Sequence, residues 1–524
     1  MTVRHQTARK VFWTLAVLAV VSAAGSEVAK RATAPKARRP LPTRWMAADG
    51  SVKPLHAAPA WAGPLRMLPV ERPSVPAPLE VRPVAGRVST QLALVVENSL
   101  YPSVSAKLQR FARDLGAAGW TVLISRFLSG TPRGLRSYLR ARYKEKGGLA
   151  GALLIGDLPY IVYEMMESWE GTNRDYDDFP CDLYYMDLDG TWSDSLSDGS
   201  VQPNNGKYDT RSGNIGLEIW VGRLQTSNLT CLGTEAGVLN DYFEKDRLFR
   251  TGALRTKPAA LVYDDDDWAS MGTGDQTNLK KVLAGTTEVS APEATTAADY
   301  KGRRLPSNLE FIYTRSHGWQ GGHGYYRSAK SIFDYVLCAD YQKIDPRALF
   351  YSLFVCSGCD YTASDYLGGV VAFNQESGLL AYGSTKTGGI WDDDEFFDTL
   401  TAGGCFGAAF VAWFNQAQTD YPQYAPPWWY GMVLVGDASL RPTVWISGAV
   451  KTAEGTVLPG VTITFSDGAG TAVTDAKGYY ARPVFGGWSG TAVPKKTGYA
   501  FSPTSRRYAR LLADKTGQNY KAVS

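Results

Sequence analysis

Residues 309–318 (LEFIYTRSHG) and residues 349–360 (LFYSLFVCSGCD) are two apolar runs that each stop at a chemically reactive side chain. Short apolar runs of this length predict buried strands. The first run ends at His317, directly before Gly318, and the second ends at Cys356, which lies 39 residues after His317. This separation leaves room for a crossover helix between two parallel strands. A thiol and an imidazole at neighbouring strand ends are what a cysteine nucleophile and its acid/base partner require.

The strand pattern continues on both sides of this pair. Further apolar runs occur at residues 92–96, 120–124, 152–155, 218–221, 259–263 and 379–382. Helical spacing separates the first two runs, because Val104, Leu108, Phe111 and Leu115 recur every three or four positions, and residues 133–146 form a basic helical stretch. Alternating strands and helices predict a three-layer α/β domain with a mostly parallel sheet. In such sheets the chemistry lies at the carboxyl ends of the strands.

The pattern changes after residue 443. Residues 444–524 contain short alternating segments such as residues 461–465 (VTITF), separated by Gly and Pro and without a helical period. This pattern predicts a small β-sandwich. Residues 474–480 (TDAKGYY) resemble the strand-turn-strand signature of carboxypeptidase-regulatory-like and immunoglobulin-like modules on secreted bacterial proteins. The resemblance implies a stabilising, spacing or surface-attachment role without chemistry.

The N-terminal segment is typical of an exported protein. Arg4, Arg9 and Lys10 precede an apolar run at residues 11–21 and small residues at 22–25, which predicts a signal peptide of residues 1–24. The run is shorter than the roughly 18 to 20 apolar residues that a membrane span needs. We therefore expect cleavage and no transmembrane span in the mature chain, with an uncleaved anchor as the alternative.

The segment after the signal peptide reads as a linker or prosegment. Residues 25–90 hold eleven of the 28 prolines, and a chain so rich in Pro and Arg does not build a core. We assign this linker or prosegment to residues 25–88, the α/β domain to residues 89–443 and the β-sandwich to residues 444–524.

Charge and cysteine content exclude two classes of protein. Residues 1–24 carry a net charge of +3 and residues 25–90 carry +7, so residues 91–524 carry −6 within the chain total of +4. An acidic folded part gives no electrostatic support for binding nucleic acid. Six cysteines in 524 residues are too few for a disulfide scaffold, although one or two bridges stay open.

Histidine is scarce, and this narrows the choice of an acid/base group. Of the four His residues, only His317 and His323 lie in the predicted α/β domain. Imidazole titrates near neutral pH without tuning, which suits a base for a thiol. Gly318 has no side chain, so its N–H can approach a substrate carbonyl. The backbone N–H groups of Gly318 and Cys356 are predicted to form an oxyanion hole.

Seven short motifs, which together span most of residues 92–442, resemble those of caspase-like cysteine peptidases, most closely the gingipain-type branch. They are LLIGD (153–157), DLYY (182–185), VGR (221–223), SHG (316–318), VCSGCDY (355–361), GST (383–385) with Trp391, and GDASLR (436–441). The resemblance implies a caspase-like three-layer αβα fold and a secreted cysteine endopeptidase. It assigns Cys356 as the nucleophile and His317 as the acid/base, implies protein or peptide substrates, and requires no organic cofactor.

The resemblance also implies an acidic residue that follows an earlier strand and orients the His. Residues 264–267 are four consecutive aspartates, and a gapless overlay favours Asp266, where the family has Glu. The choice among the four stays open, and the alternative is a solvated or calcium-binding loop.

Two further residues are assigned to the substrate pocket by the same resemblance. Asp275 lies near the acid that selects Arg or Lys in some gingipains, and Trp391 resembles the aromatic wall of the first specificity pocket. The alternatives are an exposed loop Asp and a core Trp.

Cys356 and Cys359 form a CxxC motif, which also fits a redox dithiol, or half of a zinc site completed by His317 and His323. The family pattern over residues 356–361 selects Cys356 as the nucleophile and makes Cys359 a candidate for a regulatory disulfide. Two alternative functions remain: a binding or adhesion protein without activity on the same fold, and a dithiol oxidoreductase.

One acidic segment is a candidate metal site. Residues 187–190 (DLDG), Asp194, Asp198 and residues 204–206 (NNG) are dense in oxygen ligands but lack EF-hand spacing. Related peptidases often use calcium for structure, so structural calcium is one interpretation and a polar surface turn is the other.

Overall fold

The computed structural model describes residues 44–46, 52–54, 79–81 and 90–523, apart from residues 146, 168–173, 328–331 and 468. The predicted signal peptide lies outside the described residues. The predicted linker is described only at three short strands, β1 (Arg44–Met46), β2 (Val52–Pro54) and β3 (Leu79–Val81), of which β1 and β2 pair antiparallel. Within the described ranges, none of the helices is long and apolar enough to cross a membrane.

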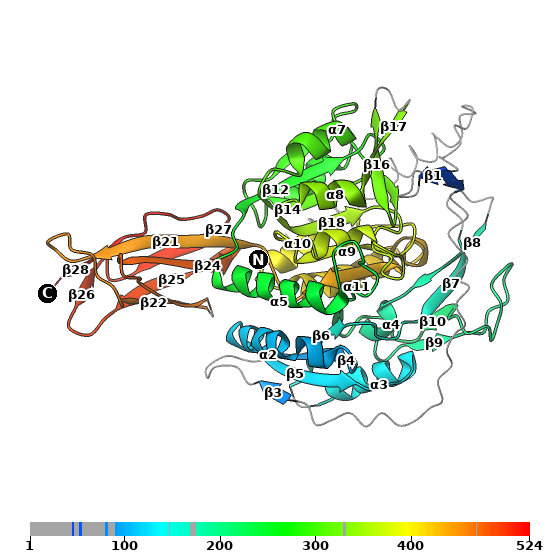
Figure 1. Cartoon of the computed structure of the whole chain (residues 1–524), viewed down its shortest axis with the longest axis horizontal. Coiled ribbons are helices and arrows are strands. Elements are labelled where there is room, and N and C mark those ends of the chain that lie inside the picture. The colour runs from blue at the N-terminus through cyan, green and yellow to red at the C-terminus, as the bar shows by residue number, and fades with distance from the viewer. Residues whose placement is uncertain are drawn as a thin grey trace, which may run out of the picture. The chain divides into compact units, whose positions relative to one another are not determined.

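A sheet of eleven strands organises the described chain up to residue 436 (Figure 1). In spatial order its strands are β13 (Thr287–Val289), β12 (Lys257–Asp264), β14 (Leu309–Arg315), β18 (Ala348–Phe354), β19 (Leu380–Ser384), β20 (Met432–Gly436), β11 (Trp220–Leu224), β6 (Leu149–Ile155), β4 (Thr90–Glu97), β5 (Trp120–Phe127) and β3. The strands from β13 to β19 are parallel to one another, and so are those from β20 to β5. The two parallel blocks meet in the antiparallel pair β19–β20, and β3 pairs antiparallel with β5. The predicted mostly parallel α/β sheet is confirmed.

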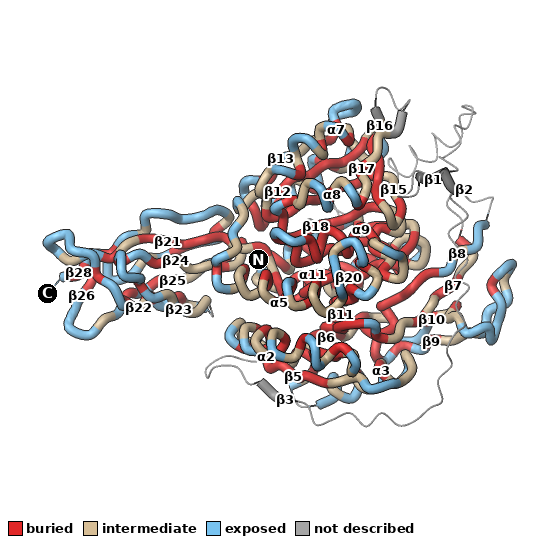
Figure 2. Tube along the Cα trace, in the orientation of Figure 1, coloured by how far each residue is buried: buried red, intermediate tan, exposed pale blue. Residues whose placement is uncertain are grey.

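Helices cover both faces of this sheet, as crossover connections require (Figure 1). The helices are α2 (Tyr101–Ala117), α3 (Pro132–Tyr143), α4 (Leu183–Met186), α5 (Glu235–Thr251), α6 (Gly272–Leu279), α7 (Ala297–Asp299), α8 (Cys338–Ile344), α9 (Leu367–Ala372), α10 (Asp394–Thr401) and α11 (Phe406–Asp420), with π-helical turns η1 (Tyr300–Arg304) and η2 (Ala425–Trp429). The predicted stripe of α2, from Val104 to Leu115, is fully buried. Figure 2 shows that the central strands of the sheet are largely buried.

Three small sheets accompany the large one. They are the pair β7 (Val162–Glu167) and β8 (Asp175–Pro180), the antiparallel pair β9 (Thr191–Ser193) and β10 (Thr210–Ser212), and the antiparallel sheet β15 (His317–Trp319), β16 (Gly322–Arg327) and β17 (Ile332–Leu337). The last sheet begins at His317, so it extends from the carboxyl end of β14.

The chain after residue 442 forms two four-stranded sheets. One contains β24 (Tyr479–Phe485), β21 (Thr443–Lys451), β28 (Tyr520–Val523) and β26 (Ala500–Ser502), and the other β23 (Gly470–Val473), β22 (Thr462–Phe465), β25 (Trp488–Lys495) and β27 (Arg506–Leu511). Apolar side chains of both sheets, such as Ile446, Ile463 and Trp488, share a second core. The predicted β-sandwich is therefore present.

The sandwich packs on the α/β domain, and both belong to one compact unit of the chain. The Arg255 guanidinium lies 3.7 Å from the ring centroid of Trp445. The Thr443 N–H donates to Glu310 Oε1 at 2.5 Å, and Glu310 is buried in β14. Glu310 lies in β14, and the candidate histidine follows the same strand. β14 therefore connects the junction between the sandwich and the α/β domain to the candidate site.

Candidate active site

Four neighbouring parallel strands end at one edge of the sheet, in the order β12, β14, β18 and β19. Asp264 is the last residue of β12 and the other three aspartates follow it, while His317 follows β14, Cys356 follows β18, and Lys386 follows β19. Parallel neighbours deliver the residues after their carboxyl ends to the same edge. The fold therefore gathers these groups although they are far apart in sequence.

The register aligns the two predicted reactive residues. Arg315 of β14 pairs with Phe354 of β18, so His317 and Cys356 each lie two residues beyond the same rung. The Ser316 N–H donates to the Phe354 carbonyl at 3.1 Å, which extends the pairing one step toward the site. The predicted imidazole and thiol thus leave adjacent strands at equal heights.

His317 has a carboxylate partner, Asp267. The Nε2 atom of His317 lies 2.8 Å from Asp267 Oδ2, and its ring packs on Trp268 with centroids 4.7 Å apart. The favoured Asp266 does not take this position, because its carboxylate accepts the N–H of Glu293 at 3.1 Å. Successive side chains of a turn point in different directions, so the structure moves the orienting acid by one residue.

The other two aspartates have structural surroundings. Asp265 is buried and accepts the N–H of Tyr326 and the hydroxyl of Thr295, each at 3.1 Å. Burial raises the pKa of Asp265 to about 6, although these hydrogen bonds act in the opposite direction. Asp264 is fully buried, 3.8 Å from Arg315 Nε. Asp265 therefore fastens the loop to the β16 strand and Thr295, and Asp264 lies beside Arg315 rather than His317.

Cys356 is partly buried beside the loop that follows β19. Burial raises the pKa of the Cys356 thiol, while the N–H of Gly388, the charge of Lys386 and the Thr387 side chain act in the opposite direction. The Ser357 N–H donates to the Lys386 carbonyl at 2.7 Å, so the two loops are fastened together. Because its pKa is raised, the resting sulfur is a thiol and needs a proton acceptor to become a nucleophile.

Lys386 is a member of the site that the sequence did not single out. Its Nζ lies 2.6 Å from Glu167 Oε2 and 3.4 Å from Asp177 Oδ2, and the side chain is fully buried. A buried cation held by two carboxylates is a fixed positive charge near the sulfur. The motif GST (383–385) directly precedes Lys386, but nothing in the sequence marked this Lys as a member of the site.

Cys359 is buried away from solvent. A Cβ at Gly368 or Gly383 would come within 2.6 Å or 2.9 Å of its sulfur, so the thiol fills the space that these glycines leave. Burial raises the pKa of the Cys359 thiol, and Asp360 adds to the effect. Both Cys356 and Cys359 are free thiols in the structure, and their regulatory disulfide stays a prediction.

His323 is a structural residue. Its Nδ1 lies 3.0 Å from Ser316 Oγ and its Nε2 lies 2.9 Å from Tyr341 Oη. Complete burial, aided by the charge of Lys301, lowers the pKa of His323 to about 3. With both ring nitrogens engaged, His323 is neither a base at neutral pH nor a ligand for a zinc site at the CxxC motif.

Close packing requires glycine at position 318, in addition to the access that its N–H needs to a substrate carbonyl. A Cβ at Gly318 would lie 2.4 Å from Val355 Cγ1 and 2.7 Å from the Gly322 carbonyl. Val355 directly precedes Cys356, so the missing side chain lets the β15–β16 hairpin lie against the cysteine loop. Gly318, one of the two residues predicted to form the oxyanion hole, therefore contacts the residue before the candidate nucleophile.

The two residues assigned to the substrate pocket, Asp275 and Trp391, have partners within the protein. Asp275 is buried in a bidentate pair with Arg315, with Oδ2 2.6 Å from Nε and Oδ1 2.8 Å from Nη2. Because this carboxylate is already neutralised, the geometry does not support its selecting a basic substrate. Trp391 is half-buried in an aromatic cluster, 4.9 Å from Trp429 and 5.2 Å from Tyr421 between ring centroids.

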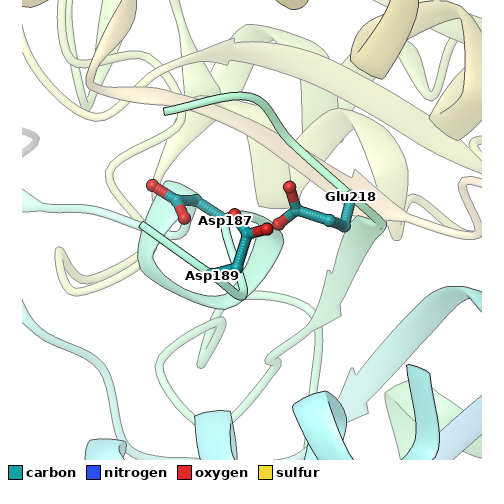
Figure 3. A group of neighbouring side chains, drawn as sticks. All are labelled: Asp187, Asp189 and Glu218. Atoms are coloured by element: carbon teal, nitrogen blue, oxygen red, sulfur yellow. The ribbon is translucent and has the colours of Figure 1, made fainter. Parts of the chain in front are cut away.

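The described residues contain one group of metal-type side chains, formed by Asp187, Asp189 and Glu218 (Figure 3). Asp187 Oδ2 already accepts a hydrogen bond from Arg211 Nε at 2.7 Å. Glu218 accepts the Leu188 N–H at 2.6 Å, and burial together with the neighbouring aspartates raises its pKa. These internal partners account for Asp187 and Glu218, and structural calcium stays an untested expectation.

Comparisons with known proteins are limited to the fold. No family model matches this sequence, and no curated protein matches it. The structure is similar to a crystal structure of the Arg-specific cysteine proteinase gingipain R, at 13% identity and a TM-score of 0.47, covering 83% of this chain and 100% of that one. A structure described only as a protease gives 13% identity, coverage of 81% and 95%, and a TM-score of 0.46. Dimeric latent PorU from Porphyromonas gingivalis gives 11% identity, coverage of 81% and 43%, and a TM-score of 0.27. At these values the likenesses carry no argument about individual residues.

Proposed function

We propose that the chain is a cysteine endopeptidase in which Cys356 is the nucleophile and His317 the acid/base. One observation carries this proposal: the two residues lie two positions beyond the same rung of adjacent parallel strands, and Asp267 holds the imidazole. The raised pKa of the Cys356 thiol supports the need for a base. His323, the other candidate base, has both ring nitrogens engaged.

The reaction follows from these roles. The ring nitrogen of His317 that does not face Asp267 takes the thiol proton, and the Cys356 thiolate attacks the peptide carbonyl carbon. Backbone N–H groups of Gly318 and Cys356 stabilise the oxyanion. The imidazolium then gives its proton to the leaving amine, and a thioester remains on Cys356. His317 next removes a proton from water, which attacks the thioester and releases the second product with a free thiol.

Export and attachment are proposed from the chain outside the site. The N-terminal pattern of residues 1–24 supports secretion of a peptidase that acts on proteins or peptides outside the cell. The β-sandwich supports a role in surface attachment. The chemistry itself requires no organic cofactor.

The decisive experiment compares four full-length proteins, the wild type, Cys356→Ala, Cys359→Ala and His317→Ala, on a peptide library under reducing conditions with calcium present. We expect Cys356→Ala to lower cleavage by about a thousandfold or more, whereas Cys359→Ala keeps activity within about tenfold and lowers the melting temperature, because it empties a packed site. Circular dichroism checks that each variant is folded.

Three outcomes would contradict the proposal. Cleavage by neither the wild type nor Cys356→Ala would leave a binding protein on this fold, and equal cleavage by both would exclude Cys356 as the nucleophile. Loss of function in a folded Cys359→Ala together with an unaffected His317→Ala would indicate dithiol chemistry instead.

A further inference from the structure

An arginine of the chain itself satisfies the carboxylate that would have selected a basic substrate. Arg315 is fully buried at the end of β14, two residues before His317. Besides its two bonds to Asp275, it donates to the Ile390 carbonyl at 2.9 Å and to Tyr313 Oη at 2.7 Å. Four of the five N–H donors of this guanidinium are thereby engaged, two of them by the Asp275 carboxylate, so Asp275 has no unbalanced charge to offer a ligand.

The remaining carboxyl groups around Arg315 do not supply a binding charge either. Asp393 accepts hydrogen bonds from Asn278 at 2.6 Å and from Tyr313 at 2.7 Å. Asp264 lies 3.8 Å from Arg315 Nε. Both carboxyls are buried, and burial raises the pKa of each, to about 6 for Asp393. Asp393 is thus engaged by two internal donors, and burial disfavours the charged form of Asp264.

Buried cations that already have carboxylate partners lie at the ends of β14 and β19, the two strands that flank β18. Arg315 precedes His317 on one side, and Lys386, held by Glu167 and Asp177, follows β19 on the other. A Lys or Arg side chain of a substrate, bound between Arg315 and Lys386, would lose its hydration without gaining an unpaired carboxylate as a partner. Such a transfer costs free energy.

An aromatic surface, formed by Trp268, Phe354 and Trp428, runs from His317 toward the loop after β19. Trp268 contacts the His317 ring at 4.7 Å and Phe354 at 5.4 Å, and Phe354 lies 5.8 Å from Trp428, all between ring centroids. Phe354 is buried, whereas both tryptophans keep partial exposure. Trp268 therefore offers a partly exposed indole beside the imidazole, and Trp428 offers a second one beyond Phe354.

Glycines bring the loop after β19 against this aromatic surface. A Cβ at Gly389 would lie 2.4 Å from the Phe354 ring, and one at Gly388 would lie 2.2 Å from the Trp428 carbonyl. The N–H of Gly388 also faces the Cys356 thiol. The loop after β19 therefore contacts both the aromatic surface and the sulfur. A substrate side chain that binds the aromatic surface belongs to a residue close to the carbonyl that Cys356 attacks.

A cavity next to Trp268 is also mainly apolar, like the aromatic surface. A cavity of about 420 Å³ opens at Ala269 and is lined mainly by small apolar side chains, among them Val289, Pro292 and Ala294. Its one carboxylate, Glu288, already accepts the Ser290 hydroxyl at 2.5 Å. Neither Asp275 nor Trp391 lines this cavity.

We propose that the site takes an aromatic or aliphatic side chain on the residue before the cleaved bond and rejects Arg and Lys there. The proposal rests on the peptidase function above and names its substrate class. Apolar surface buried against Trp268 and Trp428 favours binding. Because Asp275 is already paired with Arg315, its carboxylate does not attract a substrate cation.

The test uses the full-length protein and four fluorogenic peptides that differ only before the cleaved bond, with Phe, Leu, Arg or Lys. We expect kcat/KM for Phe or Leu to exceed that for Arg and Lys by at least about tenfold. Equal values, or a preference for Arg or Lys, would overturn the proposal.

Variants locate the preference. Trp428→Ala is expected to lower kcat/KM for the Phe peptide about tenfold and to leave the Arg peptide unchanged. The matched control Trp391→Ala, in the separate aromatic cluster, is expected to keep the ratio. Arg315→Ala unpairs Asp275 and should shift the ratio toward Arg, and Arg315→Ala with Asp275→Ala should remove that shift. If the Arg315 variants do not fold, the four-peptide comparison on the wild type decides.

Calorimetric binding of the same peptides to Cys356→Ala separates this proposal from the peptidase function. Tighter binding of the Phe peptide than of the Arg peptide, with no cleavage by the wild type, would keep the apolar preference and reject the peptidase. Equal binding of both peptides, or binding of neither, with no cleavage by the wild type, would overturn the preference.

Discussion

Four consecutive aspartates, residues 264–267, have four different environments. Asp264 lies near a buried arginine, Asp265 caps a hairpin N–H, Asp266 accepts the N–H of Glu293, and Asp267 holds His317. Their chemistry is identical, so composition cannot rank them. The turn after β12 decides, because each successive residue points in a new direction.

The pair Asp266 and Asp267 gives a matched test at the scale of the residue. Asp267→Asn removes the charge that stabilises the imidazolium, so we expect kcat/KM to fall about 10- to 100-fold. Asp266→Asn keeps a side-chain acceptor for the Glu293 N–H and is expected to stay within about twofold of the wild type. Steady-state kinetics on one cleaved peptide measures both variants, and a larger loss in Asp266→Asn would restore the assignment made from sequence.

At the scale of elements, strand order creates the site. β12, β14, β18 and β19 are neighbours in space and parallel, so their carboxyl ends meet. Each predicted apolar run corresponds to a strand of the large sheet. β3, β13 and β20 were not predicted, although residues 432–436 (MVLVG) are apolar. Their position follows from long-range pairing, above all the antiparallel contact of β20 with β19.

Gly318 offers a prediction about how the hairpin meets the cysteine loop. Gly318→Ala places a methyl group against Val355 and the Gly322 carbonyl, so we expect a loss of about 1–3 kcal/mol of stability from overpacking, with reduced activity. Gly274→Ala in α6 is the control, because a Cβ there meets nothing within 4 Å. Urea denaturation measures both. Equal stability of the two variants would contradict the prediction, because it would show that the β15–β16 hairpin accommodates the added methyl group without a loss of stability.

At the scale of the whole molecule, the sandwich meets the α/β domain at a buried acid. Glu310 accepts the Thr443 N–H, and burial raises the pKa of Glu310 to about 8. The folded chain therefore keeps this proton up to about pH 8, whereas the unfolded chain loses it near the ordinary value of 4.5. Between these values the unfolded state binds fewer protons, so this group's contribution to stability falls as the pH rises.

Glu310→Gln tests the junction. Gln keeps an acceptor for the Thr443 N–H and cannot ionise, so we expect the variant to be more stable than the wild type at pH 9, by on the order of 1 kcal/mol or more, and nearly equal at pH 5. Exposed Glu395→Gln should show no such pH dependence. Melting temperatures across this range measure the difference. A constant difference at both pH values would contradict a buried ionisable junction.

The sequence by itself determined the local pattern: the apolar runs that become strands, the helical stripe of α2, the β-sandwich segments, and the placement of His317 and Cys356 at strand ends. These features depend on periodicity and on the chemistry of neighbouring residues. Only the tertiary structure decided that Asp267 holds His317, that Arg315 neutralises Asp275, and that His323 and Cys359 are buried. Such pairings join segments far apart in the chain, and they depend on strand order and on the direction of each side chain in a turn.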